Sequence, residues 1–213
     1  RPEGQRVHSY DFSNGTQLHV LPRRDVPVVA ARAAFLGGLL ADTPERAGLA
    51  HFTTALWMRG TRARSATGFA RAVENLAAEV DSFSGRNSIG VVLEATSDKL
   101  MPTLDLFTEV LLEPAFDPDE LERERRETLA AIERRKDHLA NRAFQLLSKT
   151  HYGSHPYSLP MIGTAESVAE LDATAPLALQ RELICGQNLV IGVSGDVDPD
   201  AIAQALSVRL ADL

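Results

Sequence analysis

The alternation of apolar and polar residues along the chain predicts several short strands. Two alternating runs, 7–12 and 17–21, flank Asn14-Gly15, a dipeptide that favours a tight turn between antiparallel strands. A continuous run of small apolar residues at 26–35 predicts a strand that is covered on at least one face. Further strands are expected at 81–85 and 88–94, around a Gly-Arg-Asn turn, and at 189–193.

Apolar residues spaced three and four apart predict amphipathic helices between these strands. They are expected at 49–60, at 66–80, and from the N-cap Ser97 to about residue 112. Asp117-Pro118 starts a longer acidic and basic helix, with Glu120 placed as in a capping box, that is expected to reach about residue 150 with a bend. Shorter helices are expected to begin at Thr164, Thr174 and Asp198-Pro199. This order of elements predicts an α+β fold, in which helices pack on one face of a mostly antiparallel sheet.

Composition narrows the classes of function. The 213 residues, 44% of them hydrophobic, are enough for one substantial core. A net charge of −7 argues against binding to a nucleic-acid backbone, and no apolar run approaches the length of a membrane span. Cys185 is the single cysteine, which excludes an internal disulfide and a cysteine zinc site. No signal peptide is visible, but the chain begins with Arg1, so a periplasmic and a cytoplasmic location both stay open.

The predicted helix at 49–60 has the spacing of a zinc-binding helix but lacks most of its chemistry. In an H-x-x-E-H segment, one helix face presents two imidazoles to zinc and a glutamate to the attacking water. The same frame here holds His51, Thr54 and Ala55. Only the first of the three positions carries a group that binds metal.

Several segments resemble the pitrilysin/insulinase-like inverted-zincin peptidases, a group that includes the mitochondrial processing peptidase and many bacterial zinc proteases. The similar segments follow one another in the family's order and cover nearly the whole chain: Ser-Asn-Gly-Thr-Gln-Leu-His-Val at 13–20, Gly-Leu-Ala-His-Phe at 48–52, Arg-Gly-Thr at 59–61, Glu-Arg-Glu-Arg at 122–125, Gly-Ser-His-Pro-Tyr at 153–157, Ile-Gly-Thr at 162–164 and Gly-Asp-Val-Asp at 195–198.

The resemblance implies a role for each position of the family's zinc site. The first histidine ligand falls on His51, the general base on Thr54, the second histidine on Ala55 and the third ligand on Ala131. The acid that supports the third ligand falls on Glu124 and is kept. A catalytic zinc ion needs three protein ligands and a base beside its water, so no zinc is expected in this domain. A small shift in alignment would instead bring Glu127 or Glu133 to the third-ligand position, and this alternative stays open.

Two other segments each allow a functional and a purely structural interpretation. In the catalytic relatives an edge strand at Ser82, Phe83, Ser84 and Gly85 pairs with the backbone of the substrate, whereas the structural interpretation is a plain hairpin turn. His151 and His155 are four apart, but the Gly and Pro residues around them predict a structured loop rather than a pair of metal ligands.

The resemblance implies that residues 1–213 form a single peptidase-like domain, one of two or four similar domains in a longer chain or assembly. The expected function is that of a catalytically inactive domain, which helps to enclose a peptide substrate together with a homologous, zinc-bearing domain or subunit. Two alternatives stay open: an active zinc metalloendopeptidase with non-standard ligands, and a scaffold subunit with no part in proteolysis.

Overall fold

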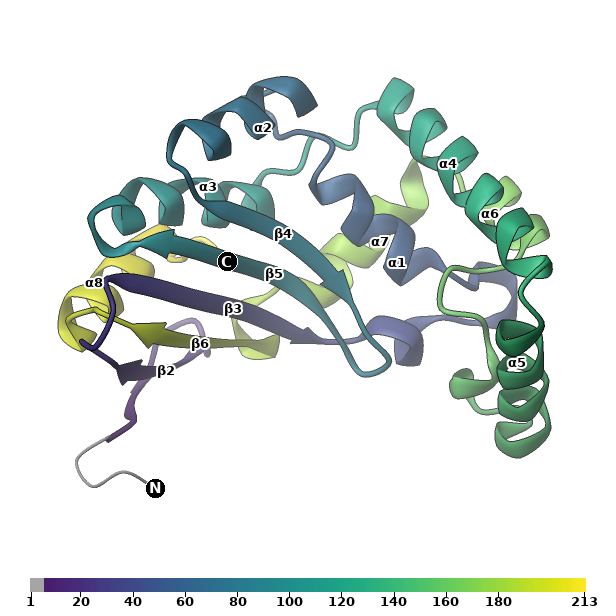
Figure 1. Cartoon of the computed structure of the whole chain (residues 1–213), viewed down its shortest axis with the longest axis horizontal. Coiled ribbons are helices and arrows are strands. Elements are labelled where there is room, and N and C mark those ends of the chain that lie inside the picture. Colours follow the sequence, from purple (N-terminus) through teal and green to yellow (C-terminus); the bar gives the residue numbers. More distant parts are fainter. Residues whose placement is uncertain (1–5) are drawn as a thin grey trace.

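The computed structural model describes residues 6–213, which form an arch of one sheet and its covering helices (Figure 1). The six strands lie in the order β1-β2-β6-β3-β5-β4. Their bounds are β1 His8–Asp11, β2 Gln17–Pro22, β3 Val28–Leu36, β4 Glu79–Ser84, β5 Ser88–Thr96 and β6 Leu189–Gly195. All neighbouring strands are antiparallel except β2 and β6, which are parallel.

Eight α-helices lie within the same described residues. Their bounds are α1 Leu49–Trp57, α2 Ala66–Asn75, α3 Leu100–Leu112, α4 Pro118–Lys136, α5 Leu139–Tyr152, α6 Ala165–Glu170, α7 Thr174–Leu183 and α8 Pro199–Arg209. Short 3-10 turns occur at Gly38–Ala41, Pro44–Arg46, Ser97–Lys99, Pro156–Ser158 and Gly186–Asn188. No helix of residues 6–213 is long and apolar enough to cross a membrane.

The helices cover one face of the sheet, as the sequence predicts. Side chains of β3 alternate between buried and exposed, because successive residues of a strand point to opposite faces. Helices α1, α2, α3 and α8 contact strands of the sheet, and their apolar stripes form one core with its inward residues. On the opposite face Val28, Ala30, Arg32 and Leu36 are exposed, so the concave side of the arch is lined by the uncovered sheet.

Three local predictions are wrong at their boundaries. The helix expected at 66–80 ends at Asn75, because residues 79–84 pair with β5 as an edge strand. Ser97 does not cap α3, since a 3-10 turn at Ser97–Lys99 precedes that helix. The helix from Pro118 does not bend through to residue 150: α4 stops at Lys136 and α5 starts in a new direction at Leu139 (Figure 1).

Candidate functional site

The start of α1 is fixed by a buried acid in the loop that precedes it. Gly48 adopts a left-handed conformation with a φ of 87°, and it has no side chain with which to cap the helix. Instead the Asp42 carboxylate, only 4% exposed, accepts hydrogen bonds from the Gly48 nitrogen at 2.8 Å and the Ala50 nitrogen at 3.1 Å. Burial raises the pKa of Asp42 to about 6, although the two backbone N–H groups favour its charged form.

The loop around Gly163, more than one hundred residues later in the chain, packs directly against the same helix start. A β-carbon at Gly48 would lie 2.5 Å from the Gly163 nitrogen, so the two backbones meet where no side chain fits. Thr164 and Ser167 form a reciprocal capping box at the start of α6, and the Ser167 hydroxyl donates to the Ala47 carbonyl at 2.8 Å. Two of the segments that carry the family resemblance are therefore in direct contact.

The three candidate positions on α1 offer one metal-binding group. His51 is half-buried, and burial lowers the pKa of its imidazole; the Glu124 carboxylate opposes this shift and Arg135 adds to it. Thr54 is 2% exposed, and its hydroxyl donates within the helix to the carbonyls of His51 (2.9 Å) and Ala50 (3.2 Å). Thr54 has no carboxylate that could take a proton from water, and the Ala55 side chain has no atom that could bind a metal ion.

Helix α4 presents one stripe toward α1. Positions 124, 128, 131 and 135 are spaced four, three and four apart, so they share a face, and α4 contacts α1. Glu124 and Arg135, at the two ends of this stripe, both act on the pKa of His51. Ala131 lies between them on the same stripe, and it brings no ligand to the site.

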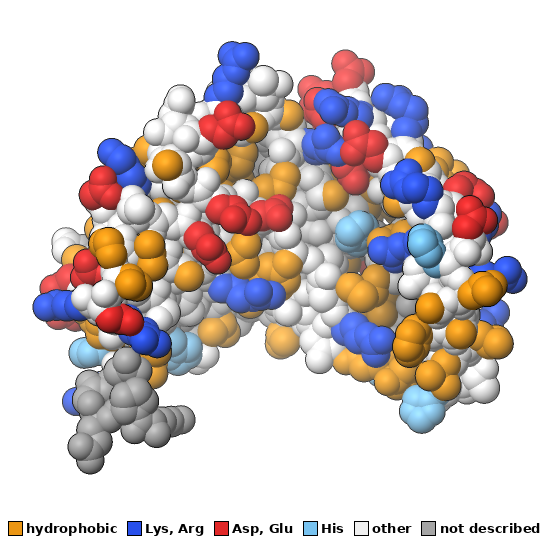
Figure 2. Space-filling view, viewed as in Figure 1, with side chains coloured by type: hydrophobic (Ala, Val, Ile, Leu, Met, Phe, Trp, Pro, Cys, Tyr) orange, Lys and Arg blue, Asp and Glu red, His pale blue; other side chains and the backbone are white. Residues whose placement is uncertain are grey.

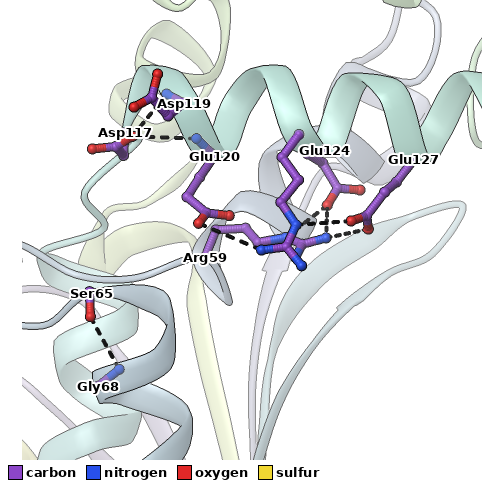
Figure 3. A network of polar contacts seen from close by, with 9 residues as sticks. Arg59, Ser65, Gly68, Asp117, Asp119, Glu120, Glu124 and Glu127 are labelled. Atoms are coloured by element: carbon purple, nitrogen blue, oxygen red, sulfur yellow. Dashed lines mark hydrogen bonds and ion pairs between the residues drawn. The ribbon is translucent and has the colours of Figure 1, made fainter.

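Glu124 belongs to an ion-pair network rather than to a metal site (Figure 3). It is 8% exposed, so it is not a surface carboxylate, and it accepts bonds from Arg59 Nη2 at 2.7 Å and Nε at 3.0 Å. Thr128 Oγ1 donates to its second oxygen at 3.3 Å. Arg59, which follows α1, also donates to Glu127 at 2.5 Å, and this bond lowers the pKa of Glu127. The network ties the end of α1 to the middle of α4.

Neither alternative third ligand is free of other partners. Glu127 binds Arg59 and Arg123, and Glu133 pairs with Lys136 at 2.5 Å while its side chain is 62% exposed. Within residues 6–213, no three His, Cys, Asp or Glu side chains gather closely enough to hold a metal ion. The donor set present therefore does not fit a catalytic zinc ion.

The predicted peptide-binding segment lies at the edge of the sheet. Strand β4 pairs only with β5 among the described strands, and Gly85, Arg86 and Asn87 form the turn between them. Phe83 is stacked under the Arg32 guanidinium, 3.5 Å from its ring centroid. Ser82 and Ser84 are half-buried. The structure thus places both features of the segment, an edge and a turn, and peptide binding there stays a prediction.

His151 and His155 have structural surroundings. His151 lies in the last turn of α5, and His155 Nδ1 accepts a hydrogen bond from the Tyr157 nitrogen at 3.2 Å. The rings of His155 and Tyr157 meet edge to face, with centroids 4.6 Å apart.

Sequence reasoning missed Asp42 and the partner of Glu124. An acid shortly before a helix that begins with Gly is a signal for the first. Arg59 lies within one of the family-like segments, but nothing local indicates that it pairs with a residue 65 positions later.

Comparison with known proteins identifies the family to which this chain belongs. Residues 22–165 match the family described as Insulinase (Peptidase family M16), and the chain belongs to that family. It is 24% identical over 196 residues to the uncharacterized zinc protease YmxG of Bacillus subtilis, covering 92% of this chain and 48% of that protein. It is 22% identical over 166 residues to the mitochondrial-processing peptidase subunit beta of Caenorhabditis elegans, covering 78% and 36%.

Solved structures share the fold over nearly all of the chain. A crystal structure of the peptidase M16 inactive domain from Pseudomonas fluorescens matches with a TM-score of 0.92 and 26% identity, over 98% of this chain and 51% of the other. A protease from Helicobacter pylori matches with a TM-score of 0.92 and 18% identity, again over 98% and 51%. The chain thus spans about half the length of these structures and of YmxG, and about a third of the mitochondrial-processing peptidase subunit.

Proposed function

We propose that this chain is a catalytically inactive peptidase-like domain, which forms part of the wall around a peptide in a metalloendopeptidase assembly. The observation that carries the proposal is the α1–α4 face, where a histidine and a buried, arginine-bound glutamate stand without a second or third ligand. Metal-assisted hydrolysis needs a metal-bound water and a base, and this face offers neither three metal ligands nor a carboxylate free to act as the base. Zinc would be held, and water activated, in a homologous partner domain or subunit.

Two further observations support a role beside a partner. The similar Pseudomonas fluorescens structure is that of an inactive domain, and its chain is about twice as long as the part matched here. Helix α5 exposes several large apolar side chains, each at least 60% accessible: Leu139, Phe144, Leu146 and Leu147. Such a helix commonly marks a surface that another domain or subunit covers.

The uncovered face of the sheet is the surface that the proposal assigns to the peptide. The free edge of β4 at Ser82–Ser84 can offer backbone groups to an extended chain, as in strand addition. Figure 2 shows this concave side hollowed between the sheet and the arm formed by α4 and α5. A chamber closed by a second half would enclose a peptide there without cutting it on this side.

Zinc stoichiometry tests the proposal directly. The purified chain is dialysed against a weak chelator and its zinc content measured by elemental analysis, together with a thermal melt. We expect near-zero zinc and a cooperative melt. One zinc per chain would overturn the proposal in favour of an active enzyme with non-standard ligands.

A restored variant provides the matched positive control. Thr54→Glu, Ala55→His and Ala131→Glu together supply the missing donors to His51 and are expected to create zinc binding at about one ion per chain. The same variant carrying His51→Ala should lose it. A restored variant that folds but binds no zinc would contradict the placement of the degenerate site.

Co-purification tests the partner. A tagged chain expressed in its native host should recover a homologous chain with an intact H-x-x-E-H segment, unless both halves are one polypeptide. If neither a recovered partner nor the native polypeptide carries this segment, the scaffold alternative is favoured.

A further inference from the structure

A second feature of the concave side lies at the elbow between α4 and α5. A cavity of about 450 Å³ opens there between the end of α4, the first turns of α5 and the loop at 157–166. Its floor and rim include apolar side chains, among them Ile132, Phe144 and Met161. Arg86, from the β4–β5 turn, closes it on the sheet side.

The lining of this elbow pocket is strongly basic. Arg86, Arg135, Lys136 and Arg142 line it, against one carboxylate, Glu166. This is the opposite of the chain as a whole, which has 29 acidic and 22 basic residues. Figure 2 shows the same contrast on the inner side of the arch: acidic side chains gather over the sheet, and basic and apolar ones mix along the α5 arm.

Three of the four cations have no anionic partner among the residues that the structure describes. Lys136 pairs with Glu133, but no carboxylate among residues 6–213 lies within 4.0 Å of the guanidinium groups of Arg86, Arg135 or Arg142. Unpaired guanidinium groups that converge on one cavity are suited to an anionic ligand.

The arrangement is partly held in place before any ligand binds. The Arg86 guanidinium lies 5.4 Å from the centroid of the Tyr157 ring, and the Tyr157 hydroxyl bonds to Asn87 in the same turn. Arg135 is fixed on α4, one turn beyond Ala131. Because Arg135 also acts on the pKa of His51, the pocket opens beside the degenerate metal face.

We propose that the elbow pocket binds carboxylate groups of an acidic peptide, with Arg135 and Arg142 as the principal partners and Arg86 as a third. Arginine binds a carboxylate through two parallel N–H bonds, and Phe144 and Met161 offer apolar contact to neighbouring side chains. The mixed basic and apolar lining suits a peptide better than a nucleic-acid backbone, which a chain of net charge −7 repels. This proposal rests on the proposed function, since it names a chemical class for the enclosed peptide.

Fluorescence anisotropy with defined peptides tests the pocket. The probe is a labelled unstructured peptide of about twelve residues with three glutamates among apolar residues, amidated at its C-terminus, and its control has glutamine at the same positions. The glutamate peptide should bind at least tenfold more tightly, and its affinity should fall as salt rises. A third peptide, the glutamine sequence with a free C-terminal carboxylate, separates a terminal carboxylate from side-chain carboxylates as the ligand.

Variants assign the binding to the pocket. Arg135→Ala with Arg142→Ala should weaken the glutamate peptide at least tenfold, and Arg86→Ala should weaken it severalfold. The Arg135 and Arg142 side chains are exposed and have no ion pair among the described residues, so the double variant should melt as the wild type does. Arg86→Ala also removes the contact with the Tyr157 ring, so its melt is measured alongside its affinity. Arg71→Ala, an exposed and unpaired arginine on α2, is the matched control and should leave binding unchanged.

Three results would overturn the proposal: equal affinity for the glutamate and glutamine peptides, equal losses in the Arg71 variant and the double variant, or a single-stranded oligonucleotide that binds more tightly than any carboxylate-bearing peptide. Failure of the pocket is distinguishable from failure of the proposed function. If the chain contains no zinc and does not bind acidic peptides, only the pocket proposal is overturned. If it contains zinc and binds them, only the proposal that the domain is inactive is overturned.

Discussion

Two glutamates on α4 bind the same arginine but differ in burial, and this difference predicts unequal contributions to stability. Glu124 and Glu127 both accept hydrogen bonds from Arg59. The Glu124 side chain is 10% exposed and that of Glu127 is 50% exposed, while Arg59 is 22% exposed. We expect Glu124→Gln to be far more costly than Glu127→Gln, although the two changes are chemically identical.

The magnitude follows from what each change leaves behind. Breaking a buried ion pair costs about 3–5 kcal/mol, because the remaining charge is desolvated and unpaired. Arg59 keeps Glu127 as a partner, so about 2–4 kcal/mol is expected for Glu124→Gln. An exposed pair contributes about 0–1 kcal/mol, which sets the expectation for Glu127→Gln. For a domain of this size the melting temperature falls by roughly 2–4 °C per kcal/mol.

Differential scanning calorimetry and urea unfolding at neutral pH measure both variants. The Arg59→Met background supplies the control, because both glutamate effects should shrink once their common partner is gone. Equal destabilisation by the two glutamine variants would refute the reasoning from burial. An undiminished Glu124→Gln effect in the Arg59→Met background would show that Arg59 is not the source of the stabilisation.

Three further predictions concern Asp42 before α1, Gly48 at its start, and the effect of removing metal on the thermal melt. Because burial raises the folded pKa of Asp42 from 3.8 to about 6, its contribution is fully present below pH 4 and lost as pH rises through 6. The wild type should therefore gain about 2 kcal/mol relative to Asp42→Asn between pH 7 and pH 4 in urea unfolding, and parallel pH profiles would contradict this. Gly48→Ala should lower the melting temperature by more than 5 °C, since a β-carbon meets the Gly163 backbone at positive φ, whereas Gly192→Ala, with open space around it, should not. Excess EDTA should leave the melt of the wild type unchanged and lower that of the zinc-loaded restored variant.

Local chemistry predicts most of the fold. Asn14-Gly15 forms the β1–β2 turn, in which the Phe12 nitrogen donates to the Thr16 carbonyl. Asp117-Pro118 starts α4, and the Asp117 carboxylate accepts from the nitrogens of Asp119 and Glu120. These signals succeed because turn and cap residues bond to neighbours a few positions away.

The errors occur where distant contacts override local preference. The break between α4 and α5 has no Gly or Pro at Asp137 and His138, and the new direction of α5 accompanies its packing on the turn at Pro156–Ser158. Likewise Val80 continues the apolar period of α2, yet it lies opposite Leu93 in the sheet. Periodicity cannot distinguish these outcomes, because both depend on which segment arrives beside the other.

The candidate site, too, could be predicted only in part from the sequence. The family resemblance assigns His51, Thr54, Ala55 and Ala131 to the positions of a zinc site, and the structure places the helices that carry them in contact. The sequence does not indicate what joins those helices instead. A tertiary contact joins them: Arg59 follows α1 in the sequence, and its guanidinium binds two carboxylates on α4.

This bridge is a link between α1 and α4 that the proposed, metal-free function requires. In a zinc peptidase of this kind, ligands from two helices join through the ion, so losing them removes a link between the helices. Here the link lies nearer the end of α1, where Arg59 and Glu124 are buried together and Thr128 satisfies the second carboxylate oxygen. Asp42 and Gly163 fix the opposite end of the same helix. Both ends of α1 are thus held by protein groups, so the proposed function needs no metal ion to keep the α1–α4 face in place.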